Sequence, residues 1–157
     1  MRITLLVLFF SPLLIFGQTE ITGTVVYVSD GDTFHLIQDN GEKIKVRVAD
    51  IDCPERTQDY GLEAKAFVIA EIKDRTVSIV IKDSDRYGRK IAFVKYDGKD
   101  LSEELLKNGF AWHYKKYSEL EYLSTLEEDS RNKKKGLWAD LTPMAPWDYR
   151  SQKRKSN

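Results

Sequence analysis

Short β-type segments separated by turn dipeptides restrict the architectures open to this chain. β-branched or alternating apolar residues fill 21–28, 33–38 and 43–50, and Asp-Gly and Asn-Gly pairs, which favour tight hairpin turns, separate them. A three-stranded meander is therefore predicted. Two further segments, 76–82 and 90–96, are joined by a polar loop and predict a second hairpin.

Helical patterns lie between and after these strands, at 61–74, 101–109 and 118–136. The first of them carries apolar residues at helical spacing, namely Leu62, Ala66, Ile69 and Ala70. We expect this face to pack on the sheet. Five strands with a helix between the third and the fourth predict an α+β, mainly β fold, a five-stranded OB-fold barrel with three packed helices.

The N-terminal segment has the layout of a secretory signal peptide. Arg2 precedes an uncharged run at 3–16, and small or polar residues follow. This run is shorter than the roughly 20 apolar residues needed to span a bilayer. We expect residues 1–17 to be a cleaved signal peptide, so that the protein is secreted or periplasmic with no stable membrane anchor. The folded domain would then span 18–150, and 151–157 would be a basic disordered tail.

The charge balance and the cysteine content exclude globally basic proteins and disulfide scaffolds. The chain has 25 Lys plus Arg and 25 Asp plus Glu, and loss of Arg2 with the signal leaves 24 against 25. A net charge of about −1 gives no global sign of nucleic-acid binding, so such a function would depend on local clusters. The single cysteine, Cys53, permits no intramolecular disulfide, so packing alone must hold the domain.

Three polar segments lie at strand ends of the predicted barrel. They are "SDGDTF" at 29–34, "DIDCPE" at 50–55 and "DRYGR" at 85–89. Each alone is an ordinary turn or a solvated loop, but together they could converge on one rim of the barrel. In the second segment, three carboxylates lie close together and would repel one another unless a cation or basic groups offset them. Carboxylate oxygens suit a hard cation such as calcium.

An arginine precedes the acidic segment on the same strand. Along 43–50, one face is apolar and consists of Ile44, Val46 and Val48. The opposite face is basic and consists of Lys43, Lys45 and Arg47. Arg47 is therefore predicted to point away from the core, five residues before Asp52.

In residue type, order and spacing, these segments resemble the staphylococcal nuclease (thermonuclease) family, and the resemblance runs from about Val25 to Trp138. The Asp-Gly-Asp-Thr turn and the Tyr-Gly-Arg loop of that family are present. So is its arginine, aspartate and glutamate spacing of five and three residues, which ends in Asp-Xaa-Pro-Glu. The matched side chains are Asp32, Arg47, Asp52, Glu55 and Arg89.

The resemblance implies a calcium-dependent, sequence-nonspecific endonuclease that hydrolyses DNA and RNA and leaves 3′-phosphate products. Arg47 and Arg89 would be catalytic, because planar guanidinium groups stabilise the charge that develops on phosphate oxygens. Glu55 would accept a proton from the attacking water or orient that water, and the sequence leaves both roles open.

The metal ligands implied by the resemblance are Asp32, Asp52 and Cys53, the last through its backbone carbonyl. The thiol of Cys53 need not touch the metal, and a buried and an exposed side chain are both compatible with the sequence. Asp50 matches no functional residue of the family, and we interpret it as a charge on the barrel rim.

Substrate contacts are expected from aromatic rings and basic side chains, because a nuclease that cuts many sequences must not read base edges. The candidates are Arg86, Tyr87, Trp112, Tyr114 and Lys115. Trp112 and Tyr114 resemble the family's tyrosine pair beside the nucleotide, with a tryptophan in place of one tyrosine. DNA and RNA are the expected partners, as substrates, and we expect the protein to act as a monomer.

Two other classes of function fit part of this pattern. A non-catalytic nucleic-acid-binding module of the staphylococcal nuclease type would share the fold, but the five matched side chains argue against it. A calcium-dependent adhesion or structural protein would explain the carboxylates but not the two arginines. Incubation with single-stranded DNA, first with calcium and then with a chelator, separates the three.

Overall fold

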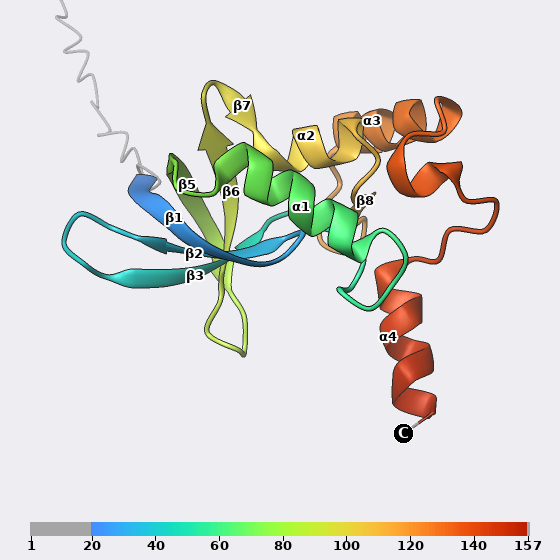
Figure 1. Ribbon diagram of the computed structural model, residues 1–157, viewed down its shortest axis with the longest axis horizontal. Coiled ribbons are helices and arrows are strands. Elements are labelled where there is room, and N and C mark those ends of the chain that lie inside the picture. Colours follow the sequence, from blue (N-terminus) through green and yellow to red (C-terminus); the bar gives the residue numbers. More distant parts are fainter. Residues whose placement is uncertain (1–19, 157) are drawn as a thin grey trace, which may run out of the picture.

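The structure, a computed structural model, describes residues 20–156 (Figure 1). Its strands are β1 (Glu20–Asp30), β2 (Thr33–Ile37), β3 (Lys43–Val48), β4 (Ile51–Asp52), β5 (Thr76–Ser84), β6 (Lys90–Tyr96), β7 (Lys99–Asp100) and β8 (Trp112–His113). Its helices are α1 (Gly61–Ile72), α2 (Leu101–Lys107), α3 (Glu121–Asn132) and α4 (Pro146–Lys155), with a 3₁₀ turn, η1 (Gly136–Ala139). The predicted signal peptide, residues 1–17, lies outside the described residues.

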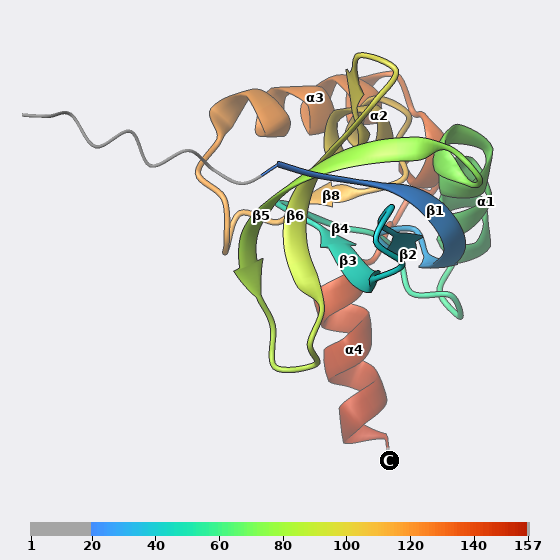
Figure 2. The ribbon, with the colours of Figure 1, turned by 90° about the vertical axis from the view of Figure 1, so that its left-hand side faces the viewer.

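Strands β1, β2, β3, β5 and β6 close into a barrel, which confirms the predicted architecture. β1 pairs antiparallel with β2 and β5, β2 with β3, and β5 with β6, and a parallel pairing of β3 with β6 completes the ring. Figure 2 shows these strands curling around one another. Irregularities in the β1–β2 register, between Val25 and Tyr27 and between Val28 and Asp30, bend β1 so that it can pair on both sides.

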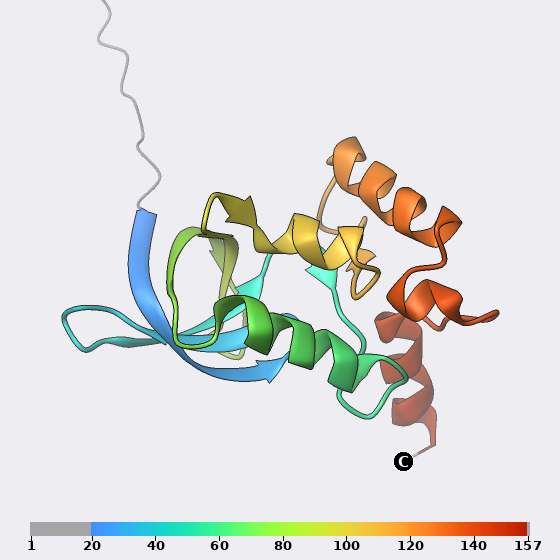
Figure 3. The same cartoon turned by 45° about the horizontal axis from the view of Figure 1, so that its top comes forward.

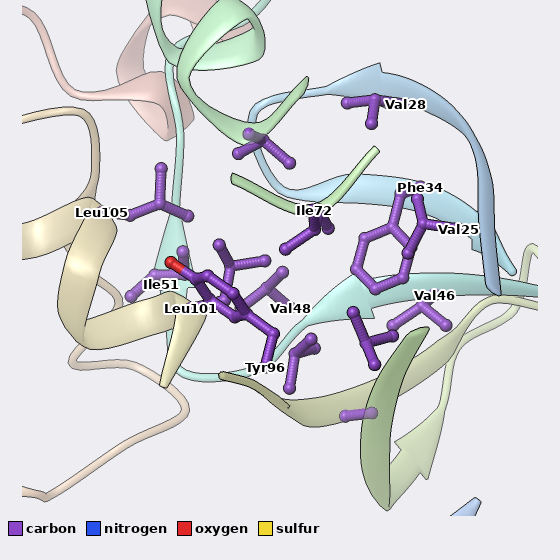
Figure 4. Close-up of a cluster of buried hydrophobic side chains, with 14 of the residues drawn as sticks. Val25, Val28, Phe34, Val46, Val48, Ile51, Ile72, Tyr96, Leu101 and Leu105 are labelled. Atoms are coloured by element: carbon purple, nitrogen blue, oxygen red, sulfur yellow. The ribbon is translucent and has the colours of Figure 1, made fainter. Parts of the chain in front are cut away.

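The hydrophobic core fills the barrel and continues beneath the helices (Figure 4). Phe34 and Val46 from the barrel, Ile72 from α1 and Leu105 from α2 are all fully buried in it. Burial of such a side chain contributes about 1.5–3 kcal/mol, so a core of this size can hold the domain without a disulfide. The alternation predicted along β3 is confirmed, because its buried residues are Ile44, Val46 and Val48.

Helix α1 packs on the barrel through a different face from the one predicted. The predicted residues are exposed, and they are Leu62, Ala66, Ile69 and Ala70. The buried residues are Gly61, Ala64, Val68 and Ile72. A Cβ atom at Gly61 would lie 2.0 Å from the carbonyl oxygen of Glu55, so the first residue of α1 sits directly on that backbone. This close approach, together with the insertion of Val68 and Ile72 into the core, fixes the rotation of the helix.

Helices α2 and α3 lie beside the barrel, next to each other (Figure 3). Asp100 caps the N-terminus of α2, because its side chain accepts hydrogen bonds from the backbone N–H groups of Ser102 at 2.9 Å and Glu103 at 3.3 Å. α2 contacts β6, and α3 contacts β8 and η1. These helices therefore support the short strand β8, which pairs with β4 at the edge of the barrel.

A fourth helix, α4, occupies the end of the described chain, where we expected a disordered tail at 151–157. The helix continues through Lys155. Its local sequence supports this, because Pro146 stands at the first helical position, Asp148 lies in the first turn, and the last turn is basic. In Figures 1 and 2, α4 and the loop between β5 and β6 project from the same side of the barrel. Within residues 20–156, no helix has the length and apolar character needed to cross a membrane.

Candidate active site

Arg47 joins two of the predicted site residues that are far apart in the sequence. Its Nη1 lies 2.6 Å from Oδ2 of Asp32, and its Nη2 lies 2.7 Å from Oδ1 of Asp52. The barrel makes this possible, because Thr33, next to Asp32, pairs with Arg47 across β2 and β3, and Asp52 follows directly in β4. The basic side chain that we expected to point away from the core is thus largely buried against two carboxylates.

Tight packing holds the Asp32 turn against the acidic segment. A Cβ atom at Gly31 would lie 2.9 Å from Cβ of Cys53 and 2.8 Å from Cβ of Ala64, so this position tolerates only glycine without a shift. The backbone N–H of Cys53 donates to Oδ2 of Asp32 at 3.2 Å, and the hydroxyl of Thr33 donates to Oδ1 at 2.8 Å. Cys53 is a free, buried cysteine, and burial raises the pKa of its thiol well above the ordinary value. The thiol is therefore a packing group.

The ionisation of Arg47 and Asp52 depends on the charged side chains around each of them. Burial alone would lower the pKa of the Arg47 guanidinium, but Asp32 and Asp52 raise it above its ordinary value. Burial raises the pKa of Asp52, whose side chain is fully buried, while Arg150 and Arg47 oppose that increase. Neighbouring guanidinium groups are thus what stabilises the ionised form of Asp52.

Glu55 lies in the loop that follows β4. Its backbone is fixed, because its carbonyl accepts from the N–H of Gln58 at 2.8 Å and its own N–H donates to the side chain of Gln58 at 3.2 Å. Its carboxylate is part-exposed and accepts a hydrogen bond from Nη1 of Arg150 at 2.7 Å. The carboxylate is therefore accessible to water beside Asp52.

Arg89 reaches the same cluster from the loop between β5 and β6. Its Nε donates to Oδ2 of Asp85 at 2.7 Å, and its Nη1 lies 3.4 Å from the hydroxyl of Thr33, which in turn donates to Asp32. A continuous series of polar contacts thus runs through the site. In order, it consists of Arg89, Thr33, Asp32, Arg47, Asp52, Arg150 and Glu55.

The expected substrate-binding aromatic residues have different environments. Trp112 is half-buried, with its ring edge-on to Trp138 at 4.5 Å and to Trp147 at 5.6 Å between ring centroids, so it packs within the protein. One face of Tyr114 is stacked on Trp147 at 5.3 Å. Tyr87 is 67% exposed, which suits it best to stack on a base.

The expected basic contacts are exposed near these rings. Arg86 donates from Nη2 to the hydroxyl of Tyr87 at 2.7 Å and lies over its ring. Lys115 lies at the edge of an open pocket of about 450 Å³, which is also lined by Tyr114 and Trp147. Arg86 and Lys115 thus lie on different elements, in the β5–β6 loop and after β8.

Asp50 is not the exposed rim charge that we expected. Only 6% of the residue is exposed, and its Oδ1 lies 2.5 Å from Nζ of Lys82. The backbone of Asp50 adopts a left-handed conformation, with φ of 66°, between β3 and β4. This turn directs its carboxylate to Lys82 on β5, and the lysine neutralises the buried charge.

Sequence reasoning missed Arg150, which stands on α4. Its Nη2 lies 2.6 Å from Oδ2 of Asp52, and its Nη1 lies 3.2 Å from Oδ1 of the same carboxylate. The helix itself had a local signal, a proline followed by an acidic first turn and a basic end. The pairing with Asp52 had none, because the two residues are 98 positions apart.

Comparison with known proteins agrees with this geometry. The sequence profile described as "Staphylococcal nuclease homologue" matches residues 45–140. The chain belongs to the staphylococcal nuclease family. It is 36% identical over 152 residues to an "Uncharacterized endonuclease" of Haemophilus influenzae, a match that covers 97% of this chain and 85% of the relative. It is 35% identical to an "Uncharacterized endonuclease" of Escherichia coli O157:H7, over 85% of this chain and 88% of the relative.

A plant protein of the staphylococcal nuclease type matches over a smaller part of its length. This chain is 35% identical to "Staphylococcal-like nuclease CAN1" of Arabidopsis thaliana over 116 residues, which make up 74% of this chain and 36% of the relative. The family match of 45–140 includes Arg47, Asp52, Glu55 and Arg89. Arg150 lies beyond it.

The donor chemistry of this staphylococcal nuclease homologue suits calcium. Within residues 20–156, no three His, Cys, Asp or Glu side chains lie close enough together to hold a metal by themselves. Asp32 and Asp52 nevertheless meet at one guanidinium, and each accepts three described hydrogen bonds of the roughly four that a carboxylate can take. Calcium completes its oxygen shell with backbone carbonyls and water, so two acidic ligands can suffice.

Proposed function

We propose that this protein is a calcium-dependent, sequence-nonspecific endonuclease that hydrolyses phosphodiester bonds of DNA and RNA. The observation that carries the proposal is the bridge that Arg47 makes between Asp32 and Asp52, with Glu55 and Arg89 in the same series of polar contacts. The family of the chain supports it, since the bacterial relatives are named endonucleases.

Two guanidinium groups would stabilise the negative charge that develops on the phosphate. Arg47 and Arg89 each use some of their N–H groups to bind carboxylates or a hydroxyl and keep others to donate. A planar guanidinium can donate two parallel hydrogen bonds to phosphate oxygens. Their burial in a site of low dielectric strengthens this interaction.

Glu55 would act on the attacking water, because its carboxylate is exposed beside the cluster. Glu55 takes one proton from the water as the water oxygen forms a bond to phosphorus. The bond from phosphorus to the 5′ oxygen breaks, that oxygen takes up a proton from solvent water, and Glu55 returns its proton to solvent before the next turnover. The products are a 3′-phosphate and a free 5′-hydroxyl.

The metal would be held by Asp32, Asp52 and the backbone carbonyl of Cys53. When bound, calcium would polarise a phosphate oxygen and add positive charge to the site. The residues of the chain then have separate tasks: the two aspartates hold the ion, and the arginines hold the phosphate. The flanking nucleotides would be bound without base-specific contacts, through stacking and phosphate contacts from Tyr87, Tyr114, Lys115 and Arg86.

The purified protein, incubated with single-stranded DNA or RNA, tests the function. We expect cleavage with calcium, loss of cleavage when a chelator is added, and 3′-phosphate ends on the products. Binding of DNA in calcium without cleavage would instead support a non-catalytic binding module. Calcium binding without any affinity for DNA would support an adhesion or structural protein.

We further propose that the protein is exported, as the N-terminal residues 1–17 indicate, and acts outside the cytoplasm as a monomer. N-terminal sequencing of protein recovered from the periplasm or the medium should find the first 17 or so residues removed. An intact Met1 on that material would contradict export by a cleaved signal.

A further inference from the structure

Arg150 lies in the site but has no part in the reaction proposed above. Its Nη1 lies 2.7 Å from Oε1 of Glu55, and its Nη2 lies 2.6 Å from Oδ2 of Asp52. We propose that Arg150 is a positioning residue of the active site, which fixes the general base Glu55 relative to the metal ligand Asp52. The inference rests on the nuclease function proposed above.

Glu55 needs such a partner, because nothing else in the described part of the chain orients its carboxylate. Within residues 20–156, the hydrogen bond from Arg150 is the one that its side chain makes. A long, part-exposed glutamate without a fixed partner would sample several rotamers. A base that must meet a water at one point would then be in the productive geometry for only part of the time.

The guanidinium of Arg150 is suited to bridge two carboxylates. It makes two contacts with Asp52 and one with Glu55, which uses the planar array of donors that a lysine lacks. It also places a positive charge between two negative ones, one of which is fully buried. Burial opposes the charged form of Arg150, but its hydrogen bonds to Asp52 and Glu55 raise the pKa of the guanidinium above its ordinary value.

Helix α4 is fixed to the segments that carry the site, so Arg150 is a built part of it. The ring of Trp147 is stacked on Tyr114, and their planes lie within 6° of each other. The hydroxyl of Tyr149 donates to the carbonyl of Thr57 at 3.0 Å. The side chain of Gln58, in the Glu55 loop, donates to the carbonyl of Met144 at 2.6 Å. The first turn of α4 and the segment before it are therefore tied to the Glu55 loop and to Tyr114, directly ahead of the arginine.

The test compares Arg150→Gln and Arg150→Lys with the wild type. Turnover of a short single-stranded DNA in calcium should fall about 10- to 100-fold in Arg150→Gln, the usual effect of losing an outer partner of a metal-site residue. Arg150→Lys should fall about tenfold, because lysine keeps the charge but not the planar fork. Calcium affinity, measured by titration calorimetry, should be unchanged or tighter in Arg150→Gln, since the variant removes a positive charge beside a ligand.

Arg154→Gln is the matched control. Arg154 stands one turn further along α4 and is exposed, so its loss removes the same charge without touching the site. We expect turnover and calcium affinity within about twofold of the wild type, since surface substitutions of this kind have small effects.

Four results would overturn the positioning role. Unchanged turnover in Arg150→Gln would show that Glu55 is oriented without it, and faster turnover would show that α4 inhibits the site. Slower turnover with weaker calcium binding and a lower Tm would show a general structural role.

If Arg150→Gln does not fold, Arg150→Lys is the variant that decides, and wild-type turnover in Arg150→Lys overturns the positioning role. An inactive wild type overturns the nuclease function itself, whereas an active wild type with an equally active Arg150→Gln overturns only this inference.

Discussion

Asp85 holds Arg89 through two hydrogen bonds: Oδ2 accepts from Nε at 2.7 Å, and Oδ1 accepts from the backbone N–H at 3.0 Å. The loop can turn back between them because Gly88 adopts φ of 76°. Burial would raise the pKa of Asp85, but the hydrogen bonds from Arg89 more than offset this and lower it. Asp85 is therefore ionised at neutral pH, with the Nη1 atom of Arg89 facing Thr33.

Asp85→Asn should lower turnover of single-stranded DNA about tenfold, because the amide keeps an acceptor but loses the charge that orients Arg89. Asp83→Asn is the matched control, since Asp83 is exposed on the same hairpin, and it should turn over DNA as the wild type does. Steady-state rates in calcium give the comparison. Equal rates for Asp85→Asn and Asp83→Asn would show that Arg89 does not need the charge of Asp85 for its orientation.

Arg89→Lys should reduce turnover by about 10² to 10³, the range for losing one donor to a developing charge. Lysine preserves the charge but cannot donate two parallel hydrogen bonds. Affinity for a short oligonucleotide, measured by fluorescence anisotropy, should change much less, since the proposed contacts of Tyr87 and Lys115 would remain. Loss of binding in proportion to turnover would assign Arg89 to substrate binding rather than to catalysis.

Asp32→Ala and Asp52→Ala should both weaken calcium binding measured by calorimetry, because each removes the carboxylate of a proposed ligand. Asp39→Ala, in an exposed turn, serves as the control and should bind calcium as the wild type does. Magnesium should support turnover poorly, because it demands a near-ideal octahedral shell at shorter distances. Equal turnover with either ion would argue against a calcium site.

The thiol of Cys53 should react slowly with a thiol reagent at pH 8 in the folded protein and completely after denaturation. Burial holds its pKa well above the ordinary value, so the reactive thiolate is scarce at that pH. Cys53→Ser should keep calcium-dependent turnover within about tenfold, or about 1.4 kcal/mol, because the proposed ligand is the backbone carbonyl. Abolished calcium binding in a folded Cys53→Ser variant would show that the side chain is needed.

The five barrel strands could be predicted from the sequence because their signals are local, whereas the two-residue strands β4, β7 and β8 were not predicted. In β3, alternation alone placed Val46 inside and Arg47 on the opposite face, and the structure has this alternation, although two carboxylates largely bury Arg47 on its own face. The five-residue spacing between Arg47 and Asp52 is also a short-range sequence signal, and so is the Tyr-Gly-Arg motif of the loop that contains Arg89. The sequence does not show that Arg47 binds Asp32, because that contact depends on the pairing of β2 with β3.

Helix α1 shows where local patterns fail. Its sequence offers two apolar faces, one with Leu62 and Ile69 and the other with Val68 and Ile72. Both have helical spacing, so periodicity cannot choose between them. The choice depends on the contact of Gly61 with the backbone of the Glu55 loop, a tertiary feature that no window of sequence contains.

Arg150 was missed and Asp50 was misjudged for the same reason. A basic residue near the end of a chain is usually solvated, and the partner of Arg150 is visible only once α4 is placed beside β4. Asp50 looked like a rim charge because its partner, Lys82, is on another strand. Charged residues are thus the hardest to place from sequence, since long-range pairing decides their burial.

Single-turnover cleavage by Glu55→Gln decides whether this cluster is a nuclease active site. Glutamine keeps the size of the side chain and an acceptor for Arg150 but cannot take a proton from water. With a short single-stranded DNA in saturating calcium, we predict a rate at least about 10² lower than the wild type, with calcium and DNA affinity retained. A wild-type rate in a folded, calcium-bound Glu55→Gln variant would contradict the proposed mechanism.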